Sequence, residues 1–245
     1  MTAHIPLAGK RVLVTGAGRG IGRGIVRTLA ASGADVVGAY RTEGEHIQTF
    51  AAELKSLPGD HHLVQADVTS AEDVEYLLGE VRARFGSLDG LVNNAGVISH
   101  IPFEQLPYEE WDRVVGTDLG ATFRVIQQAL PLFGAGASVV NIGSRSATVG
   151  IPTRAHYTAA KAGLIGLTRS LAKEFGGRGL RFNVVAPGVI ETEAELPEAV
   201  VQKYRGLTSV GRLGRADEVA HAVAFLLSDL SSYITGETLN VDGGI

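Results

Sequence analysis

Short apolar runs alternate with amphipathic segments along the whole chain. Residues 11–16 form a β-branched run that ends in glycine, and residues 21–33 then carry Ile21, Ile25 and Leu29 at helical spacing. The same alternation continues to the end of the chain. It predicts strands over 11–16, 34–40, 61–67, 90–96, 137–144, 180–188 and 237–244, and helices over 21–33, 45–57, 71–85, about 109–133, 157–175 and 216–228.

This alternation predicts the fold class. Strands that read as continuous apolar runs are buried on both faces, and strands separated by helices form right-handed βαβ units with a parallel sheet. No change of composition long enough for a linker interrupts the chain. We therefore expect one domain over residues 1–245, an α/β fold with a doubly wound, mostly parallel seven-stranded sheet and helices on both faces. Ligands of such folds bind beyond the carboxyl ends of the strands.

Composition excludes several classes of protein and site. The 245 residues are 45% hydrophobic and carry a net charge of -4, with no basic run for nucleic acid. The absence of cysteine excludes disulfides and thiolate metal sites, and the histidines are not spaced as metal ligands. No stretch approaches the roughly 18 apolar residues of a membrane helix, and residues 1–16 lack an apolar leader segment. These features predict a cytoplasmic protein with no metal, nucleic-acid or membrane partner.

The first strand ends in a glycine-rich turn, TGAGRGIG, over residues 15–22. Gly16, Gly20 and Gly22 lie between a strand and a helix, where backbone N–H groups and the helix N-terminus can face a pyrophosphate. The spacing is G-x-x-x-G-x-G and not the commoner G-x-G-x-x-G, and glycines at such turns are often only structural. The position directly after the first strand favours a dinucleotide site.

The end of the second strand carries Tyr40 and Arg41, where an NAD site would place an acid for the ribose hydroxyl. Arg41, together with Arg19 of the glycine-rich turn, can hold a 2′-phosphate through charge-assisted hydrogen bonds. The alternative is a pair of solvated surface arginines. Because neither position 40 nor position 41 is acidic, the sequence favours NADP(H) over NAD(H) as cofactor.

The later strand ends also carry polar groups, although paired asparagines after a strand can be mere turn chemistry. In chain order these groups are Asp67-Val68, which is placed to meet an adenine ring, NNAG at 93–96, Ser144, Tyr157 and Lys161 on the next helix, and PGVIET at 187–192.

In this order and spacing, TGAGRGIG, NNAG, Ser144, YTAAK and PG resemble the motifs of the short-chain dehydrogenase/reductase family, and the match covers essentially the whole chain. Residues 211–244 are most similar to 3-oxoacyl-carrier-protein reductases and polyketide ketoreductases. The resemblance implies a Rossmann-type fold and an NAD(P)-dependent oxidoreductase that acts on CH–OH or C=O groups. It assigns cofactor binding to Gly16, Arg19, Gly20, Ile21, Gly22, Tyr40, Arg41, Asp67, Val68, Asn94, Ala95, Gly96, Tyr157, Lys161, Pro187, Gly188, Ile190 and Thr192.

Tyr157 and Lys161 fall on one face of the predicted helix. A phenol is a poor acid–base catalyst at neutral pH because it ionises at about pH 10, and a nearby ammonium favours the phenolate. The pair therefore makes a phenol that can exchange a proton with a substrate oxygen near neutrality. Standing alone, YTAAK would be read as ordinary helix surface. The family resemblance implies that Tyr157 protonates the developing alkoxide, Lys161 also binds the nicotinamide ribose, and Ser144 orients the carbonyl.

Position 118 departs from the family pattern, which has asparagine in a T-N-L context where this chain has Asp118. The family asparagine helps to hold a water that links the lysine to solvent. An ionised aspartate accepts but cannot donate a hydrogen bond, and its charge near Lys161 would partly cancel the effect of that lysine on Tyr157. We expect the relay to persist and count Asp118 as catalytic together with Ser144. The alternative is slowed turnover in a partly specialised protein.

Residues 188–215 follow the sixth strand and lack clean periodicity until their middle, which predicts a substrate lid. His100 and His156 are expected to face solvent or the rim of the pocket and to play no part in catalysis. The apolar candidates for a substrate wall, which can equally serve only to pack the lid, are Val97, Ile98, Ile101, Val149, Ile151, Val189, Ile190, Leu196 and Tyr204.

Three functions remain open from the sequence. The first is an NADPH-dependent ketoreductase for a 3-oxoacyl or polyketide-type ketone, free or bound to a carrier protein. The second is an NAD-dependent alcohol dehydrogenase for a small hydroxy compound, and the third is a weakly catalytic nucleotide-binding protein. Residues 127–138 hold no lysine or arginine for an acidic carrier protein, which weakens a fatty-acid substrate. The resemblance also implies a homotetramer built through residues 109–133 and 157–175.

Overall fold

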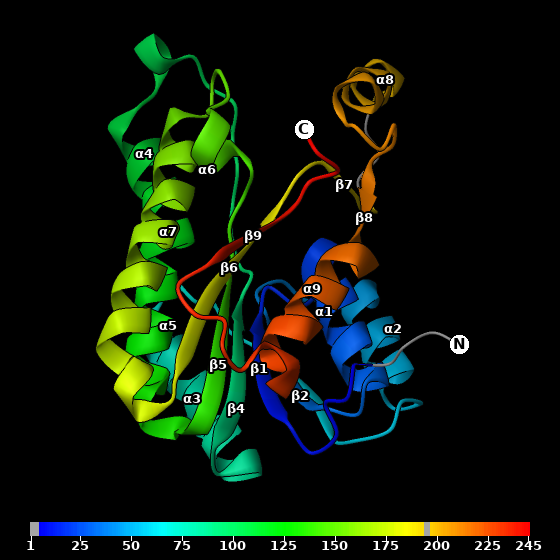
Figure 1. Ribbon diagram of the computed structural model, residues 1–245, viewed down its shortest axis with the longest axis vertical. Coiled ribbons are helices and arrows are strands. Elements are labelled where there is room, and N and C mark those ends of the chain that lie inside the picture. Colours follow the sequence, from blue (N-terminus) through cyan, green and yellow to red (C-terminus); the bar gives the residue numbers. More distant parts are fainter. Residues whose placement is uncertain (1–4, 194–196) are drawn as a thin grey trace.

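A seven-stranded sheet forms the centre of the molecule, in the order β3-β2-β1-β4-β5-β6-β9 (Figure 1). The structure is a computed structural model that describes residues 5–193 and 197–245. Every pair of neighbouring strands in this sheet is parallel, as predicted. The strands are β1 Arg11–Thr15, β2 Asp35–Tyr40, β3 His61–Gln65, β4 Leu88–Asn93, β5 Phe133–Ile142, β6 Arg181–Pro187 and β9 Thr238–Val241.

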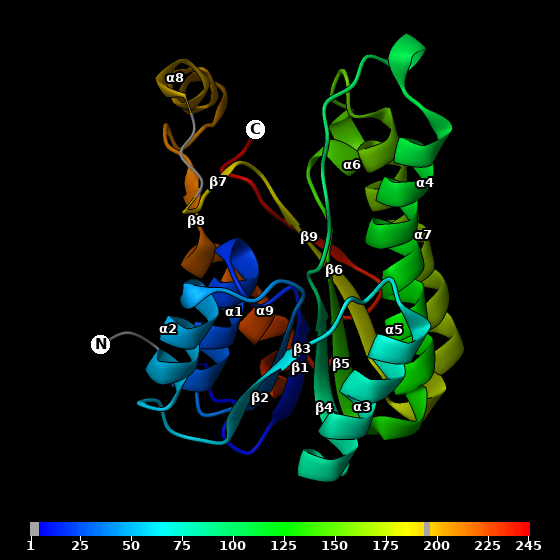
Figure 2. The same cartoon turned by 180° about the vertical axis from the view of Figure 1, so that it is seen from behind.

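Helices cover both faces of this sheet. Figures 1 and 2 show α1, α2 and α9 on one side and α3, α5 and α7 on the other. Among the residues that the structure describes, none of the helices combines the length and the apolarity needed to span a bilayer. The helices are α1 Gly20–Ala31, α2 Glu45–Leu54, α3 Ala71–Phe85, α4 Tyr108–Val115, α5 Ala121–Ala129, α6 Ser146–Val149, α7 Ala155–Phe175, α8 Glu198–Leu207 and α9 Ala216–Leu227.

The sheet separates two apolar cores. Val12 of β1 packs in one core with Ile25 and Leu29 of α1, whereas the next residue, Leu13, packs in the other core with Leu77 of α3. Successive side chains of a strand point to opposite faces, so a strand covered on both faces needs apolar residues at nearly every position. This is why the strands read as continuous apolar runs.

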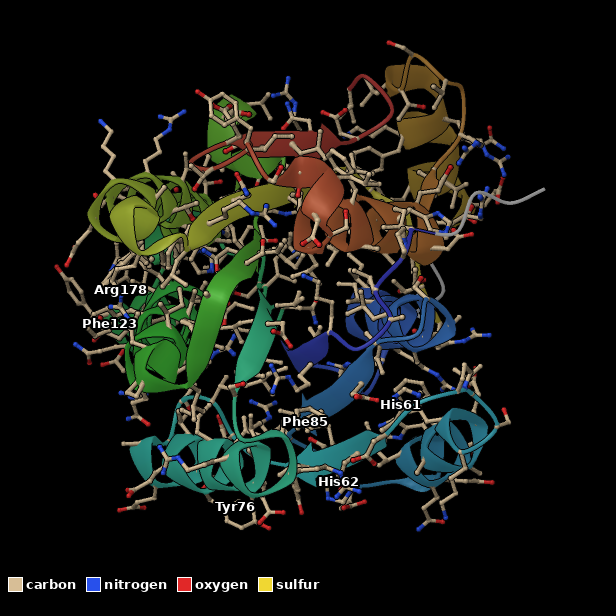
Figure 3. All side chains as sticks on the ribbon, turned by 60° about the horizontal axis from the view of Figure 1, so that its bottom comes forward. His61, His62, Tyr76, Phe85, Phe123 and Arg178 are labelled. Carbon is tan, nitrogen blue, oxygen red and sulfur yellow. The ribbon has the colours of Figure 1, made fainter. Side chains whose placement is uncertain are left out.

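The strand order reverses between β1 and β4. The chain moves outward from β1 to β3 and then continues on the other side of β1 from β4 onward. Loops that leave two such strands diverge to opposite faces, which opens a crevice at the carboxyl edge of the sheet. Figure 3 shows the opposite, amino edge, with His61 and His62 at the start of β3 and Phe85 at the end of α3.

The predicted helix over 109–133 is not one continuous α-helix. α4 passes into a π-helical turn at Gly116–Gly120 and then into α5, which ends at Ala129. A π-helical turn inserts an extra residue and often marks a functional site, and here it contains the buried Asp118. β5 begins at Phe133, earlier than predicted, because Phe133 pairs with Leu88 ahead of an irregularity in the ladder.

A second, two-stranded ladder joins the two ends of residues 188–215, and the sequence analysis did not predict it. β7 Ile190–Glu191 pairs in parallel with β8 Gly214–Arg215, with α8 between them in the chain (Figure 1). Strands of two residues are too short to produce a detectable period. Leu196, a predicted wall residue of this segment, lies outside the described residues.

Candidate active site

The glycine-rich turn after β1 adopts a shape that requires glycine. Gly16 and Gly20 have φ values of 65° and 54°, in the left-handed region, and a Cβ on Gly22 would lie 2.0 Å from the carbonyl oxygen of Gly16. The exposed Arg19 is the N-cap residue of α1. The N–H of Gly20 donates to the Glu193 carboxylate at 2.9 Å. This N–H group therefore binds an anionic oxygen, as a pyrophosphate site at a helix N-terminus requires.

Asn94 fastens this turn to the end of β4. Its Nδ2 donates to the carbonyl oxygens of Thr15 and Gly16, at 3.1 and 2.9 Å. The hydroxyl of Thr15 in turn accepts from the N–H groups of Asn94 and Ala95, at 3.1 Å each. Asn94 thus shapes the cofactor turn through its side chain. Gly96 follows, where a Cβ would lie 3.2 Å from an Asp118 oxygen.

An acidic side chain that the sequence analysis did not consider, Glu43, lies in the loop after β2. Glu43 accepts a hydrogen bond from the Tyr40 hydroxyl, and burial together with this carboxylate raises the pKa of Tyr40 to about 12. Burial opposes ionisation of Asp67, but hydrogen bonds from Thr69 and the charge of the exposed Arg41 hold its pKa below the ordinary value. Arg41 and Asp67 therefore stand near each other at the ends of β2 and β3.

Ser144 and Tyr157 lie at the carboxyl edge, after β5 and in the first turn of α7. The Ser144 Oγ accepts from the N–H and the hydroxyl of Ser146, at 3.2 and 2.9 Å. Because both contacts use Ser144 as acceptor, its own proton remains available to a substrate oxygen. Tyr157 is half-buried, so its ring is anchored while part of it faces outward.

Lys161 and Asp118 form a buried ion pair next to Tyr157. Lys161 Nζ lies 3.3 Å from Asp118 Oδ2, donates to the Ile142 carbonyl at 3.0 Å, and lies 5.6 Å from the centroid of the Tyr157 ring. Asp118 is 0% exposed, and its Oδ1 accepts from the N–H of Val97 at 2.8 Å. Burial raises the pKa of Asp118, and the charge of Lys161 opposes that rise without cancelling it.

A buried polar chain that the sequence analysis missed connects the elements of this site. Asn93 Nδ2 donates to Asn141 Oδ1 at 2.8 Å, and Asn141 Nδ2 donates to Thr168 Oγ1 at 2.9 Å. These bonds join β4, β5 and α7, whose neighbouring residues include Asn94, Ser144 and Tyr157. The available signal was an asparagine inside each of two apolar strands, because a buried amide needs partners.

The prediction that His156 faces solvent or the rim of the pocket is wrong, because this residue is 0% exposed. Its Nε2 lies 2.7 Å from Ser99 Oγ, which also contacts a carboxylate oxygen of Glu110. A carboxylate can only accept, so Ser99 donates to Glu110 and accepts from the Nε2–H of His156. The burial depends on this distant partner, which local sequence does not reveal. His100 is exposed.

Glu110 is expected to stabilise the fold only above acidic pH. Hydrogen bonds from Arg113 and Ser99 lower its pKa from 4.5 to about 2, so its contribution is fully present above pH 4.5 and is lost as the pH falls towards 2. The Glu110→Gln variant should be about 1–2 kcal/mol less stable than the wild type at neutral pH. Denaturant unfolding of both proteins at neutral and at acidic pH measures this, and a difference that does not shrink in acid would contradict it.

The end of β6 closes the site. Pro187 accepts from the N–H of Arg145 at 2.9 Å, and the N–H of Gly188 donates to the Val241 carbonyl at 3.0 Å. A Cβ on Gly188 would lie 2.8 Å from the Cα of Asp242, so two backbones meet here. Of the other predicted cofactor residues, Ile21 and Val68 pack against the two cores, Ile190 is in β7, and Thr192 lies next to Gly20.

Comparison with known proteins places this geometry in a family. A family model described as enoyl-(acyl carrier protein) reductase matches residues 16–245. The chain is 43% identical over 242 residues to the 3-oxoacyl-[acyl-carrier-protein] reductase FabG of Escherichia coli (strain K12), with 97% of each chain covered. A solved short-chain dehydrogenase/reductase from Serratia marcescens BCRC 10948 superposes with a TM-score of 0.93 and 33% identity over 98% of each chain. The chain belongs to the short-chain dehydrogenase/reductase family.

This short-chain dehydrogenase/reductase is therefore an NAD(P)-dependent oxidoreductase with a Rossmann-type fold, and the predicted family and fold class are confirmed. It is 40% identical over 240 residues to the FabG reductase of Staphylococcus aureus (strain Mu50 / ATCC 700699), covering 96% of this chain and 98% of the relative. A short-chain dehydrogenase from Burkholderia cenocepacia J2315, solved in complex with NADP, superposes with a TM-score of 0.91 and 36% identity over 97% of this chain and 98% of that one.

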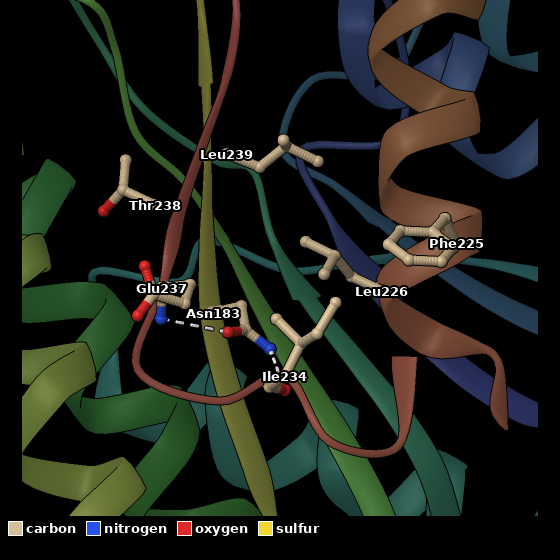
Figure 4. A pocket seen from close by; sticks show the side chains of 7 residues that line it. All are labelled: Asn183, Phe225, Leu226, Ile234, Glu237, Thr238 and Leu239. Atoms are coloured by element: carbon tan, nitrogen blue, oxygen red, sulfur yellow. Dashed lines mark hydrogen bonds between the residues drawn. The ribbon is translucent and has the colours of Figure 1, made fainter. Parts of the chain in front are cut away.

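A separate pocket of this short-chain dehydrogenase/reductase lies among β6, α9 and β9, at the outer edge of the sheet (Figure 4). Asn183 accepts from the N–H of Glu237 at 3.1 Å and donates to the Ile234 carbonyl at 2.9 Å. Its amide is thus satisfied within the protein, and the other lining side chains, such as Phe225 and Leu239, are mostly apolar. The residues predicted for catalysis and cofactor binding do not line this pocket.

Proposed function

We propose that this enzyme is an NADPH-dependent ketoreductase in which Tyr157 donates a proton to the oxygen of a substrate ketone. The observation that carries the proposal is the Lys161 ammonium, buried 5.6 Å from the centroid of the Tyr157 ring. The Tyr157 hydroxyl can transfer a proton to a substrate oxygen by general acid catalysis, and the Lys161 ammonium lies beside its ring. When bound, the nicotinamide supplies the hydride.

The other side chains hold the reacting groups in place. Ser144 donates its free proton to the carbonyl oxygen and orients it beside Tyr157. Lys161 binds the nicotinamide ribose, and Asp118 holds Lys161 and its link to solvent. The residues that would hold the cofactor are Gly16, Arg19, Gly20, Ile21 and Gly22 at the pyrophosphate, Tyr40 and Arg41 at the adenosine ribose, Asp67 and Val68 at the adenine, and Asn94, Ala95, Gly96, Pro187, Gly188, Ile190 and Thr192 around the nicotinamide half.

The proposed substrate is a ketone of the 3-oxoacyl or polyketide type, free or attached to a carrier protein. The relatives at 40% and 43% identity are both 3-oxoacyl-[acyl-carrier-protein] reductases, which supports a substrate with a 3-oxoacyl group. A second candidate is an NAD-dependent alcohol dehydrogenase of a small hydroxy compound. Glu43 favours it, because a carboxylate at the end of the second strand is the group that binds the ribose hydroxyls of NAD.

A panel of ketones with NADPH and with NADH tests the proposal, with oxidation of the reduced nicotinamide followed by absorbance. Reduction of 3-oxoacyl compounds with a preference for NADPH is expected. Faster oxidation of small alcohols with NAD⁺ would favour the second candidate. No turnover across the panel would overturn the assignment of Tyr157 as proton donor.

Arg41 is expected to discriminate between the two cofactors. The Arg41→Ala variant should bind NADPH about 10- to 100-fold more weakly, because a charge-assisted contact to the 2′-phosphate is lost, while NADH binding changes little. Fluorescence titration with each cofactor measures both affinities. Arg178→Ala is the matched control, because that exposed arginine (Figure 3) lies in the turn between α7 and the start of β6, at the amino edge of the sheet. An equal loss for both cofactors would contradict the role.

Asp118→Asn is expected to leave turnover intact or to raise it. The asparagine oxygen can still accept from the N–H of Val97, and the negative charge 3.3 Å from Lys161 Nζ is removed. Steady-state rates for the variant and the wild type, measured with one ketone at saturating NADPH, test this. Complete loss of turnover in a folded variant would show that the carboxylate has a specific role in catalysis.

We also propose a cytoplasmic homotetramer built through α4, α5 and α7, with residues 188–215 as the substrate lid. Exposed aromatic side chains on α4 and α5 support the assembly: Tyr108 is 85% exposed and Phe123 is 49% exposed. Figure 3 shows Phe123 at the periphery. Sedimentation or light scattering of the purified protein tests the number of subunits.

A further inference from the structure

Unfavourable features accumulate at the start of α7, just ahead of Tyr157. Thr153 is the one non-glycine residue with a positive φ, 67°, among residues 5–193 and 197–245, and this conformation is strained for a β-branched side chain. Arg154 is the N-cap residue of α7, whose first turn has no acidic side chain. A positive charge at a helix N-terminus is unfavourable, because that end already carries partial positive charge. Strain of this kind tends to persist where function requires it.

Two hydrogen bonds bring another histidine to the same place. The N–H of Ile101 donates to the Thr153 carbonyl at 2.9 Å, and His156 Nε2 lies 2.7 Å from Ser99 Oγ. Ile101 directly follows His100 in the chain, and Ser99 directly precedes it, so the two bonds flank His100. His100 is therefore held opposite the stretch that contains Arg154. Burial and the positive charges of Arg154 and His156 lower the pKa of His100.

The positive charge of Arg154 has no counterion in the described part of the chain. No carboxylate there forms an ion pair with its guanidinium, and its Nε is buried without a hydrogen-bond partner. The Nδ1 of His156 is also buried and unpartnered. The carboxylate of Glu110, which faces His156 through Ser99, is already bound by Arg113 at 2.7 and 2.8 Å. Buried polar groups without partners are rare and carry a cost.

The polar cluster of Arg154, His100 and His156 lies at the start of α7, one helical turn from the proposed proton donor. Arg154 is the N-cap residue of α7 and Tyr157 is the third residue of that helix, so three positions separate them. We propose that Arg154 and His100 bind a carboxylate of the substrate itself, so that the enzyme reduces small keto acids whose carboxylate lies one or two carbons from the ketone. This inference rests on the proposed function and narrows its substrate class.

A bound carboxylate would satisfy the features that are otherwise costly. It supplies the missing counterion to Arg154, accepts from the neutral imidazole of His100, and opposes the positive end of α7. A phosphate on the arm of a carrier protein would lie many bonds from the ketone, too far to reach Arg154 while the ketone meets Tyr157. The cluster therefore favours a free keto acid over a carrier-bound thioester.

The test compares 3-oxobutanoate with its methyl ester, which differ in the negative charge. The wild type should prefer the acid, and Arg154→Gln should lower kcat/KM for the acid by about 10- to 100-fold while changing that for the ester by less than about 3-fold. Arg154→Lys should fall between the two, and His100→Gln should show a smaller loss for the acid alone. Arg82→Gln, at an exposed position in the last turn of α3, is the matched control.

Equal reduction of acid and ester by the wild type would overturn the inference while the proposed function stands. An equal loss for both substrates in Arg154→Gln would assign Arg154 a purely structural role. If neither substrate is reduced, the ketone panel decides the proposed function, and binding of 3-oxobutanoate decides the inference separately. Titration of the protein with 3-oxobutanoate should then shift the imidazole NMR signals of His100 in the wild type but not in Arg154→Gln. No shift in the wild type would overturn the site.

Discussion

Tyr157→Phe is expected to lower kcat by about 10²- to 10⁴-fold, the range that general acid catalysis contributes. The substitution removes the hydroxyl that we propose as proton donor to the substrate oxygen, and it keeps the ring beside Lys161. Because Tyr157 is half-buried and the ring is retained, the fold and the cofactor turn should remain intact. Turnover with saturating ketone and NADPH measures the loss.

Three controls accompany this variant. Thermal unfolding should match the wild type, and NADPH binding should weaken little, because the residues proposed for the pyrophosphate and the 2′-phosphate belong to other elements. Tyr76→Phe, at a tyrosine of α3 that is 58% exposed, provides a matched loss of a hydroxyl away from the site. Turnover near the wild-type rate in Tyr157→Phe would remove the basis of the ketoreductase assignment.

Lys161→Met is expected to abolish activity and also to lower the free energy of unfolding by about 3–5 kcal/mol at neutral pH, the cost of leaving a buried charge without its partner. Asp118 is 0% exposed and Lys161 is 4% exposed, so water cannot replace the lost ammonium. Denaturant unfolding measures the change. The deficit should shrink in acid, where Asp118 takes up a proton in the folded state.

The double variant Lys161→Met with Asp118→Asn separates stability from catalysis. Removing both charges should restore most of the lost stability, since a neutral amide costs less to bury than an unpaired carboxylate. Activity should remain absent, because no ammonium stands beside Tyr157. If Lys161→Met alone is as stable as the wild type, the Lys161–Asp118 ion pair, despite its 3.3 Å separation, contributes nothing to folding stability.

These two effects illustrate a conflict built into the site. Lys161 must be buried near Tyr157 to act on it, yet a buried ammonium requires a counterion or hydrogen bonds. The Ile142 carbonyl and Asp118 meet that need. The aspartate therefore stabilises the lysine and at the same time weakens its electrostatic effect on the phenol, which is why Asp118→Asn should keep or raise turnover whereas Lys161→Met abolishes it.

The order of strands and helices could be predicted because each element carries its own period. The run at 11–16 and the spacing of Ile25 and Leu29 identify β1 and α1 without reference to the rest of the chain. Tyr157 and Lys161 could be placed on one helix face for the same reason, since one helical turn separates them, but their interpretation as a catalytic pair depended on the family motifs around them. Predictions were wrong where a distant segment intervenes, as at Phe133, whose strand pairing depends on Leu88.

The sequence alone thus determined the doubly wound parallel sheet, the glycine-rich turn after β1 and the Tyr157–Lys161 pair, since short-range spacing and hydrophobic period specify each of them. Only the tertiary structure decided which polar groups are buried and what satisfies them. His156 lies 57 positions from Ser99, and Asn93 lies 48 positions from Asn141. A polar side chain can leave water only where a partner is waiting, and packing of the whole chain, not local pattern, brings that partner into place.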